Sequence, residues 1–176
     1  MLPSCKTYIR CLFCVTGKEE HVAARICEAG LGNAFHPQKK KPFFKNGEWE
    51  DRQVSLLPGY VFVAADTPVP LSVFCQISGV IRPLTYGPDD HEGYLTGNDL
   101  GLAVWLMQEK GIVDKLDAVE EGGRIRIVDG LLKDINGKVL HVDRRKRLAH
   151  VELEIVGNIH GVWLGLNFLE RAENSV

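Results

Sequence analysis

The strongest local charge in this chain of 176 residues is a basic run between two apolar segments. Four consecutive cations, Arg144, Arg145, Lys146 and Arg147, follow Asp143 at a break in the apolar pattern. Like charges this close repel one another, so the run is unfavourable unless an anion faces it. Against RNA phosphates each cation would release condensed counterions, and arginine would add bidentate contacts to phosphate or guanine. The run is therefore a candidate RNA-binding turn, and a solvated hairpin turn is the alternative.

Other cations extend this charge if they share its side of the fold: Arg124, Arg126, Lys133 and Lys138. An A-form RNA helix hides the base edges of its major groove from side chains. A small domain with this basic surface is therefore expected to recognise mainly the backbone shape of RNA, with few base contacts.

Metal binding and acid–base chemistry are less well supported. His141 and Asp143 lie two residues apart on a predicted strand near His150, but no third convincing ligand or cleft accompanies them. Cys11 and Cys14 point to opposite faces of a predicted strand, and no second Cys-x-x-Cys completes a metal site. No phosphate-binding glycine loop, nucleophile elbow or paired carboxylates are present. We expect no enzyme, no metal and no cofactor.

An aromatic strand is the second candidate site. Pro58 and Gly59 bend the chain after Leu57 and before a predicted strand over residues 60–64. Tyr60 and Phe62 are two residues apart, so both point to one face of that strand. Aromatic residues with this spacing are more often core residues than contact residues, and the pattern alone leaves both interpretations open.

The N-terminal elements alternate between strands and helices, which predicts an α+β sandwich ending near Lys110. Predicted strands cover residues 8–15, 34–37, 60–64 and 80–84. Thr16 and Glu19 have the spacing of a capping box at the start of a helix that Gly30 ends. Later helices are expected from Thr67-Pro68 and over residues 96–110. The last of these carries the apolar residues Leu100, Val104, Trp105 and Met107.

Residues 38–53 have a different composition, with lysines around two phenylalanines and an Asn46-Gly47 pair that marks a hairpin tip. We interpret this segment as an exposed, mobile basic loop.

The C-terminal part has an all-β pattern. Residues 111–122 are predicted to form a linker between a domain of residues 1–110 and a domain of residues 123–176. Five short strands are then predicted, over residues 124–128, 138–143, 148–155, 160–164 and 168–169. So many short strands in a short segment predict a small, closed five-stranded barrel.

Composition is that of a globular protein, with 45% hydrophobic residues, a formal net charge of −2 and a pI near 6.3. A local basic patch can face phosphates even when the net charge is slightly negative. No apolar run is long enough for a membrane span or a signal peptide, and the five cysteines are not a disulfide framework. We expect a cytoplasmic monomer.

The N-terminal motifs resemble those of the NusG family of transcription elongation factors, whose NGN domain carries a Pro-Gly-Tyr strand. The matching segments are residues 16–20, 57–63 and 79–82. In that family the aromatic strand lines an apolar depression that binds the clamp helices of RNA polymerase. The resemblance therefore implies an RNA polymerase-binding role for Tyr60 and Phe62, together with Leu57.

The C-terminal segments, residues 125–130 and 137–139, resemble the KOW barrel of the same family. Leu131 stands where the family usually has proline, and Asp134 where glycine is frequent. With residues 16–20, 79–84 and 143–145, these features resemble LoaP, a branch of specialised antiterminators. The resemblance implies that the KOW domain binds an RNA hairpin in the leader transcript of a specific operon.

The sequence thus predicts an antitermination factor that binds RNA polymerase through its NGN domain and an RNA hairpin through its KOW domain. The first alternative is a general NusG-type elongation factor whose KOW domain binds a ribosomal or termination protein. A ribosome-associated KOW protein is a further alternative, although such a protein would not need the Pro58-Gly59-Tyr60 strand.

Overall fold

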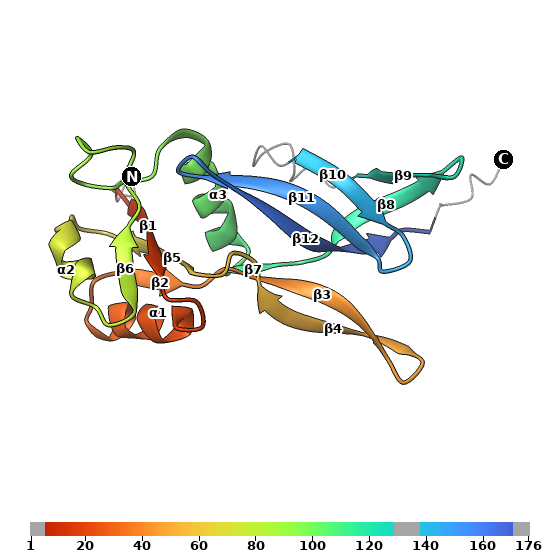
Figure 1. The fold of residues 1–176 in the computed structure, drawn as a ribbon, viewed down its shortest axis with the longest axis horizontal. Helices are drawn as coiled ribbons and strands as arrows, with labels where there is room; N and C mark the ends of the chain where they lie inside the picture. The colour runs from red at the N-terminus through yellow and green to blue at the C-terminus, as the bar shows by residue number, and fades with distance from the viewer. Residues whose placement is uncertain (1–5, 129–137, 171–176) are drawn as a thin grey trace, which may run out of the picture.

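The strand predicted around Tyr8 lies inside a four-stranded antiparallel sheet, the N-terminal sheet. The computed structural model describes residues 6–128 and 138–170. The strand order is β2 (Asn33–Phe35), β5 (Tyr60–Ala65), β1 (Tyr8–Cys14) and β6 (Val80–Pro83). Both faces of β1 are buried, as its apolar sequence predicts: Cys11 lies in one hydrophobic cluster and Cys14 in the other. Figure 1 shows this sheet at one end of an elongated molecule.

One face of the N-terminal sheet is covered by α1 (Glu19–Glu28) and the short α2 (Leu71–Cys75). Val22 and Ile26 of α1 pack with Phe74 of α2 against β1 and β5. The predicted capping box is wrong in detail, because α1 begins after Lys18 and no side chain caps it. Helix α2 also begins later than predicted, after Pro70.

The other face packs against α3 (Gly97–Gln108). The predicted apolar stripe of this helix is only partly correct. Trp105 is buried as expected, but Val104 is exposed, and Leu102 and Leu106 supply the buried face. Nearly every residue of this helix core is apolar or small, so periodicity gave little information about its orientation.

The predicted mobile loop over residues 38–53 is wrong. The segment forms a regular antiparallel hairpin, which we call the aromatic hairpin, made of β3 (Gln38–Lys45) and β4 (Glu48–Ser55). Its tip does lie at Asn46-Gly47, where both residues have positive φ as a two-residue hairpin turn requires. The base of β3 also pairs in parallel with β7 (Ile112–Val113).

A five-stranded barrel-like sheet forms the other end of the molecule, which confirms the predicted α+β fold class. Its order is β10 (Lys138–Asp143), β11 (Leu148–Ile155), β12 (Asn158–Phe168), β8 (Leu116–Glu121) and β9 (Arg124–Ile127). The two last predicted strands are one continuous strand, β12. Strands β7 and β8 occupy most of the predicted linker, residues 111–122, and β8 is part of the barrel-like sheet itself.

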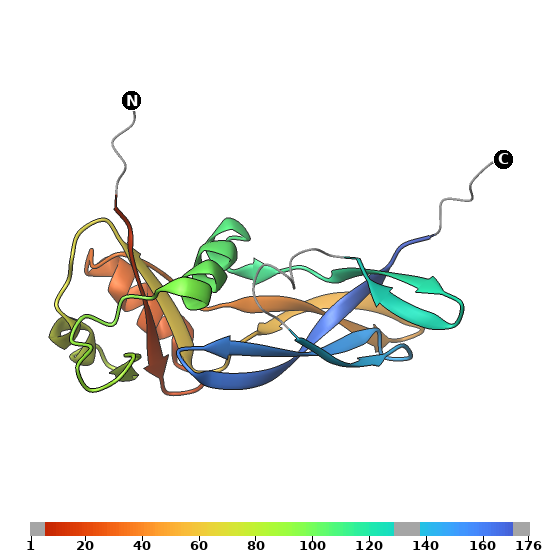
Figure 2. The ribbon, with the colours of Figure 1, turned by 90° about the horizontal axis from the view of Figure 1, so that it is seen from above.

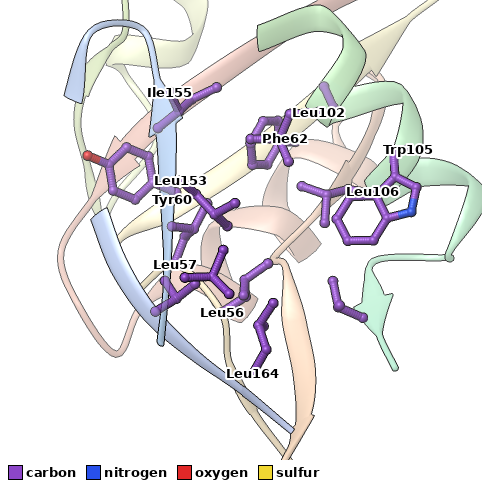
Figure 3. Packing of buried hydrophobic residues seen from close by; sticks show 14 of the residues in the cluster. Leu56, Leu57, Tyr60, Phe62, Leu102, Trp105, Leu106, Leu153, Ile155 and Leu164 are labelled. Atoms are coloured by element: carbon purple, nitrogen blue, oxygen red, sulfur yellow. The ribbon is translucent and has the colours of Figure 1, made fainter. Parts of the chain in front are cut away.

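The β11–β12 hairpin extends beyond the barrel-like sheet and reaches the N-terminal sheet (Figures 1 and 2). Along β11, pairing with β10 reaches Glu152, and β12 pairs with β8 only from Leu166 onward. Residues 153–160 therefore project past both neighbouring strands, and we call them the hairpin tip. The tip and the N-terminal sheet share one hydrophobic cluster (Figure 3).

Candidate functional site

The Pro58-Gly59 turn is held by the start of α1. Glu19 accepts hydrogen bonds from the N–H groups of Gly17 and Gly59, each at 2.7 Å. Burial acts to raise the pKa of Glu19, but the backbone N–H donors outweigh it, so the pKa lies below its ordinary value. The carboxylate thus links the helix start to the aromatic strand forty residues later in the chain.

Only glycine fits position 59 without strain. Gly59 has φ +86°, and a Cβ there would lie 3.0 Å from the Phe13 ring and 3.2 Å from the Cys14 carbonyl oxygen. The same backbone accepts a hydrogen bond from the Cys14 N–H at 2.7 Å. This close approach sets the direction in which the strand after Gly59 leaves the turn.

The aromatic strand has both side chains on one face, as the spacing predicts, and that face is covered. The exposed fractions of Leu57, Tyr60 and Phe62 are 1%, 6% and 0%. Phe62 stacks on Phe35 with ring centroids 5.7 Å apart, and Tyr60 contacts Phe13 at 5.5 Å. All three predicted polymerase-binding residues are therefore out of reach of another protein in this arrangement.

The cover over this face comes from the β11–β12 hairpin. Figure 3 shows Leu153, Ile155 and Leu164 beside Tyr60 and Leu57, in the cluster that also holds α3. The hydrophobic effect favours this contact, because leucine and isoleucine side chains on both sides leave water. We call this arrangement, with the hairpin tip lying on the aromatic strand, the closed arrangement. It is stabilised mainly by the burial of apolar side chains.

Two polar contacts mark the edge of the cover. The Val156 N–H donates to Asp99 Oδ1 of α3 at 3.0 Å, and the ring of His160 meets Tyr60 edge-on at 5.0 Å. Burial lowers the pKa of His160, and its Nε2 has no hydrogen-bond partner among the described residues. Protonated His160 would place an unpaired charge against Tyr60, so the closed arrangement favours neutral histidine.

The basic run, residues 143–147, forms the turn between β10 and β11 and is called the basic turn below. Asp143 shapes it by accepting a hydrogen bond from the Lys146 N–H at 2.9 Å, and Arg147 has a positive φ of 55°. Asp143 is therefore a turn residue, which explains its place before the cations.

The basic turn does not present four equivalent charges. Arg144 is paired with Glu120 at 2.8 Å, and Lys146 lies 3.9 Å from Asp143. Arg147 lies over the ring of Trp49, 4.8 Å from its centroid. Arg145 is exposed and forms no ion pair with any described residue.

The other predicted cations that the structure describes are spread over the barrel-like sheet. Arg124 and Arg126 lie on β9, where Arg126 is paired with Glu121 at 3.2 Å. Lys138 lies at the opposite end of β10 from the basic turn. Lys133 lies outside the described residues, as do Leu131 and Asp134. Among the predicted cations that the structure describes, only residues 144–147 lie together as one compact cluster.

Sequence reasoning missed the contact between the basic turn and the aromatic hairpin. Trp49 lies under Arg147, and a groove of about 580 Å³ separates the aromatic hairpin from Arg145 and Lys146. The sequence evidence for the aromatic hairpin was the Asn46-Gly47 pair between segments that contain phenylalanine and tryptophan. Nothing local indicated that a turn one hundred residues later packs beside it.

The histidines near the basic turn form an aromatic stack. His150 lies parallel to Trp163 with centroids 4.7 Å apart, and His141 meets the same ring edge-on at 6.2 Å. In the part of the chain that the structure describes, no group of three or more potential ligands is arranged to hold a metal ion. Likewise, no described helix is long and apolar enough to cross a membrane.

A helix-flanked antiparallel sheet joined to a small barrel-like sheet is the arrangement that the resemblance to NGN and KOW domains implied. Residues 10–92 match the family model described as "Transcription termination factor nusG". The matched residues include the Pro-Gly-Tyr strand and cover a little less than half of the chain.

A similar fold extends over most of the chain. The solved structure described as "Domain interaction in Thermotoga maritima NusG" covers 91% of this chain, and this chain covers 94% of that one. The TM-score is 0.51 and the sequence identity 17%, so the likeness concerns the fold. No curated protein sequence matches the chain.

Proposed function

We propose that this protein is a transcription elongation factor that binds RNA polymerase through Leu57, Tyr60 and Phe62. The observation that carries the proposal is the NusG family match over residues 10–92, which contain this strand. The three side chains share one apolar cluster, as a surface for packing against polymerase helices requires. In this proposal residues 1–110 act as the polymerase-binding domain and residues 123–176 as the barrel domain.

Polymerase binding then requires the hairpin tip to leave the N-terminal sheet. Tyr60 and Phe62 have almost no exposed surface while Leu153 and Ile155 cover them. Polymerase and the hairpin tip would therefore compete for one surface, and the apparent affinity for polymerase would scale with the open fraction.

For the barrel domain we propose binding of an RNA hairpin through the basic turn, and antitermination in a specific operon, as in LoaP. The support is the clustering of Arg145, Lys146 and Arg147 at one exposed turn, where phosphates can approach from solvent. Cations on β9 and at Lys138 would then contribute less, because they lie apart from this turn.

A general elongation factor with a protein bound to the barrel is the second candidate. It is favoured by the ion pairs of Arg144 with Glu120 and of Arg126 with Glu121, which neutralise part of the positive charge. RNA binding would depend mainly on Arg145 and Arg147, so changing these two residues distinguishes the two candidate functions.

The test is binding of the full chain to a structured RNA hairpin, titrated across salt. Changing Arg145 and Arg147 to alanine is expected to weaken binding and to reduce the salt slope by roughly 0.7–0.9 per lost phosphate contact. Arg25→Ala, an exposed cation on α1, is the matched control and should leave both quantities unchanged. Equal affinity and slope in the double variant would favour the protein-binding candidate.

A further inference from the structure

The tip of the aromatic hairpin exposes large aromatic side chains. Phe44 is 62% exposed and Trp49 is 39% exposed, although both are among the most hydrophobic residues in the chain. Their ring centroids are 5.3 Å apart with planes tilted by 58°, so together they form one side of a shallow aromatic surface. Isolated exposed apolar residues are ordinary, but two aromatic rings in contact beside a groove indicate a binding surface.

Cations border these rings from two directions. Arg147 of the basic turn lies 4.8 Å from the Trp49 ring centroid. Lys41 and Arg52 of the aromatic hairpin lie 5.3 Å and 5.0 Å from the centroid of Phe43. The groove of about 580 Å³ between these groups is lined by Lys41, Phe43, Phe44, Trp49, Arg145 and Lys146, among others.

The positive charge in this groove is only partly compensated. Arg52 is paired with Glu50, and Lys146 lies near Asp143. Among the described residues, no carboxylate forms an ion pair with Lys41, Arg145 or Arg147. The groove therefore combines uncompensated cations with partly exposed aromatic rings, which suits a ligand carrying both negative charge and flat apolar groups.

The two walls of the groove are held in a fixed relation. At Gly165 of β12, a Cβ would lie 2.8 Å from Pro42 Cδ and 3.0 Å from the Lys40 carbonyl oxygen, so the two backbones approach closely. Ion pairs from Lys40 to Asp114 at 3.1 Å and from Lys115 to Asp51 at 2.9 Å lie at the same junction. Figures 1 and 2 show the aromatic hairpin running alongside the barrel strands towards the same end of the molecule.

We propose that this groove binds unpaired nucleotides of RNA, with bases stacked on Phe44 and Trp49 and phosphates beside Arg145 and Lys41. This inference rests on the proposed RNA binding by the basic turn and extends that site to a second element. Bases inside a duplex hide their faces in the stack, so only single-stranded nucleotides can use an aromatic surface. The occupant is therefore a single-stranded segment that flanks the RNA hairpin.

The experiment compares three RNAs that share one hairpin: a blunt form, a form with a six-nucleotide 3′ flank, and a form whose flank is abasic. Binding to the full chain is measured by fluorescence anisotropy. The wild-type protein is expected to prefer the flanked form by roughly 10-fold or more, because each stacked base contributes substantially to affinity. The abasic flank keeps its phosphates, so it should give only a small part of that gain.

Changing both Phe44 and Trp49 to alanine should abolish the preference for the flanked RNA, measured as the ratio of flanked to blunt affinity within each protein, because the loss of Trp49 also removes the ring under Arg147. Trp49→Phe retains a ring and should keep most of the preference. Ile159→Ala, which removes an exposed apolar residue at the hairpin tip, is the matched control. All these side chains are exposed, so the variants should fold.

The outcomes separate this inference from the proposed function. If the wild-type protein binds the hairpin but the double alanine variant keeps its preference for the flank, the aromatic groove does not bind bases. Equal gain from the abasic flank would also overturn it, because phosphates alone would then suffice. No affinity for any of the RNAs would reject the RNA-binding function itself. Binding of an acidic peptide with equal affinity at the same residues would overturn the assignment to RNA.

Discussion

The hydrogen bond between Asp99 and the hairpin tip provides a direct test of whether the tip covers the surface proposed to bind polymerase. Asp99 Oδ1 accepts from the Val156 N–H at 3.0 Å, and Val156 has a positive φ of 46°. Asp99→Ala removes this bond without touching Tyr60, Phe62 or the barrel-like sheet. The variant is therefore expected to shift the protein towards the open arrangement while both folded parts remain intact.

The magnitude follows from the type of bond. A hydrogen bond to a charged group contributes about 1.5–3 kcal/mol, which corresponds to a change of roughly 10- to 150-fold in the ratio of closed to open protein. When the closed form dominates, apparent affinity for polymerase rises in proportion to the open fraction. We therefore expect Asp99→Ala to bind RNA polymerase about 10-fold or more tightly than the wild-type chain.

The assay is equilibrium binding of the full chain to RNA polymerase, with Tyr86→Phe as the control. The Tyr86 hydroxyl donates to Asp99 Oδ2 at 2.7 Å, so this control disturbs the same carboxylate but leaves the bond to Val156 in place. Unchanged polymerase affinity in Asp99→Ala, with a normal thermal unfolding curve, would refute the competition between polymerase and the hairpin tip.

Three further predictions concern pH and two glycines. Because burial lowers the pKa of His160, its contribution to the closed form is fully present above the unfolded pKa near 6.5 and is lost as pH falls. Polymerase affinity should therefore rise between pH 7.5 and 5.5, and His160→Phe should flatten this change. Gly59→Ala should lower the free energy of unfolding by about 1–3 kcal/mol in denaturant unfolding, because a side chain at φ +86° is strained and would also meet the Phe13 ring. Unchanged stability would contradict the close approach of the Gly59 backbone to Phe13. Gly165→Ala should separate the aromatic hairpin from β12, seen as faster amide exchange in β3, whereas Gly122→Ala, which meets nothing within 4 Å, should not affect that exchange.

The elements that the sequence predicted well are those whose pattern is local. The continuous apolar run of β1 indicated a strand covered on both faces, and the predicted bounds of β10 and β11 are correct. The Pro58-Gly59 turn was also predicted correctly, because proline fixes its own φ and glycine permits a positive φ at its own position. Periodicity is sufficient in these cases since each strand's own residues determine which face is buried.

The features that were missed depend on contacts between distant segments. Strand β4 is exposed along most of its length, so it lacks the alternation that marks a half-buried strand, and it is held by pairing with β3. The burial of Tyr60 and Phe62 by residues 153–164 likewise left no local signal, because the hydrophobic residues of the hairpin tip fit a barrel core equally well. The roles of the site residues in binding polymerase and RNA remain predictions.

Strand β11 joins the two proposed binding regions directly. The basic turn precedes its first residue, Leu148, and the hairpin tip contains its last, Ile155. Eight residues of extended chain span about 26 Å, and pairing with β12 along the whole length stiffens them. If RNA binds at the basic turn as proposed, a force on that turn would be transmitted along the paired strand to the hairpin tip. The two regions would then be coupled mechanically, with no change of fold in the barrel-like sheet.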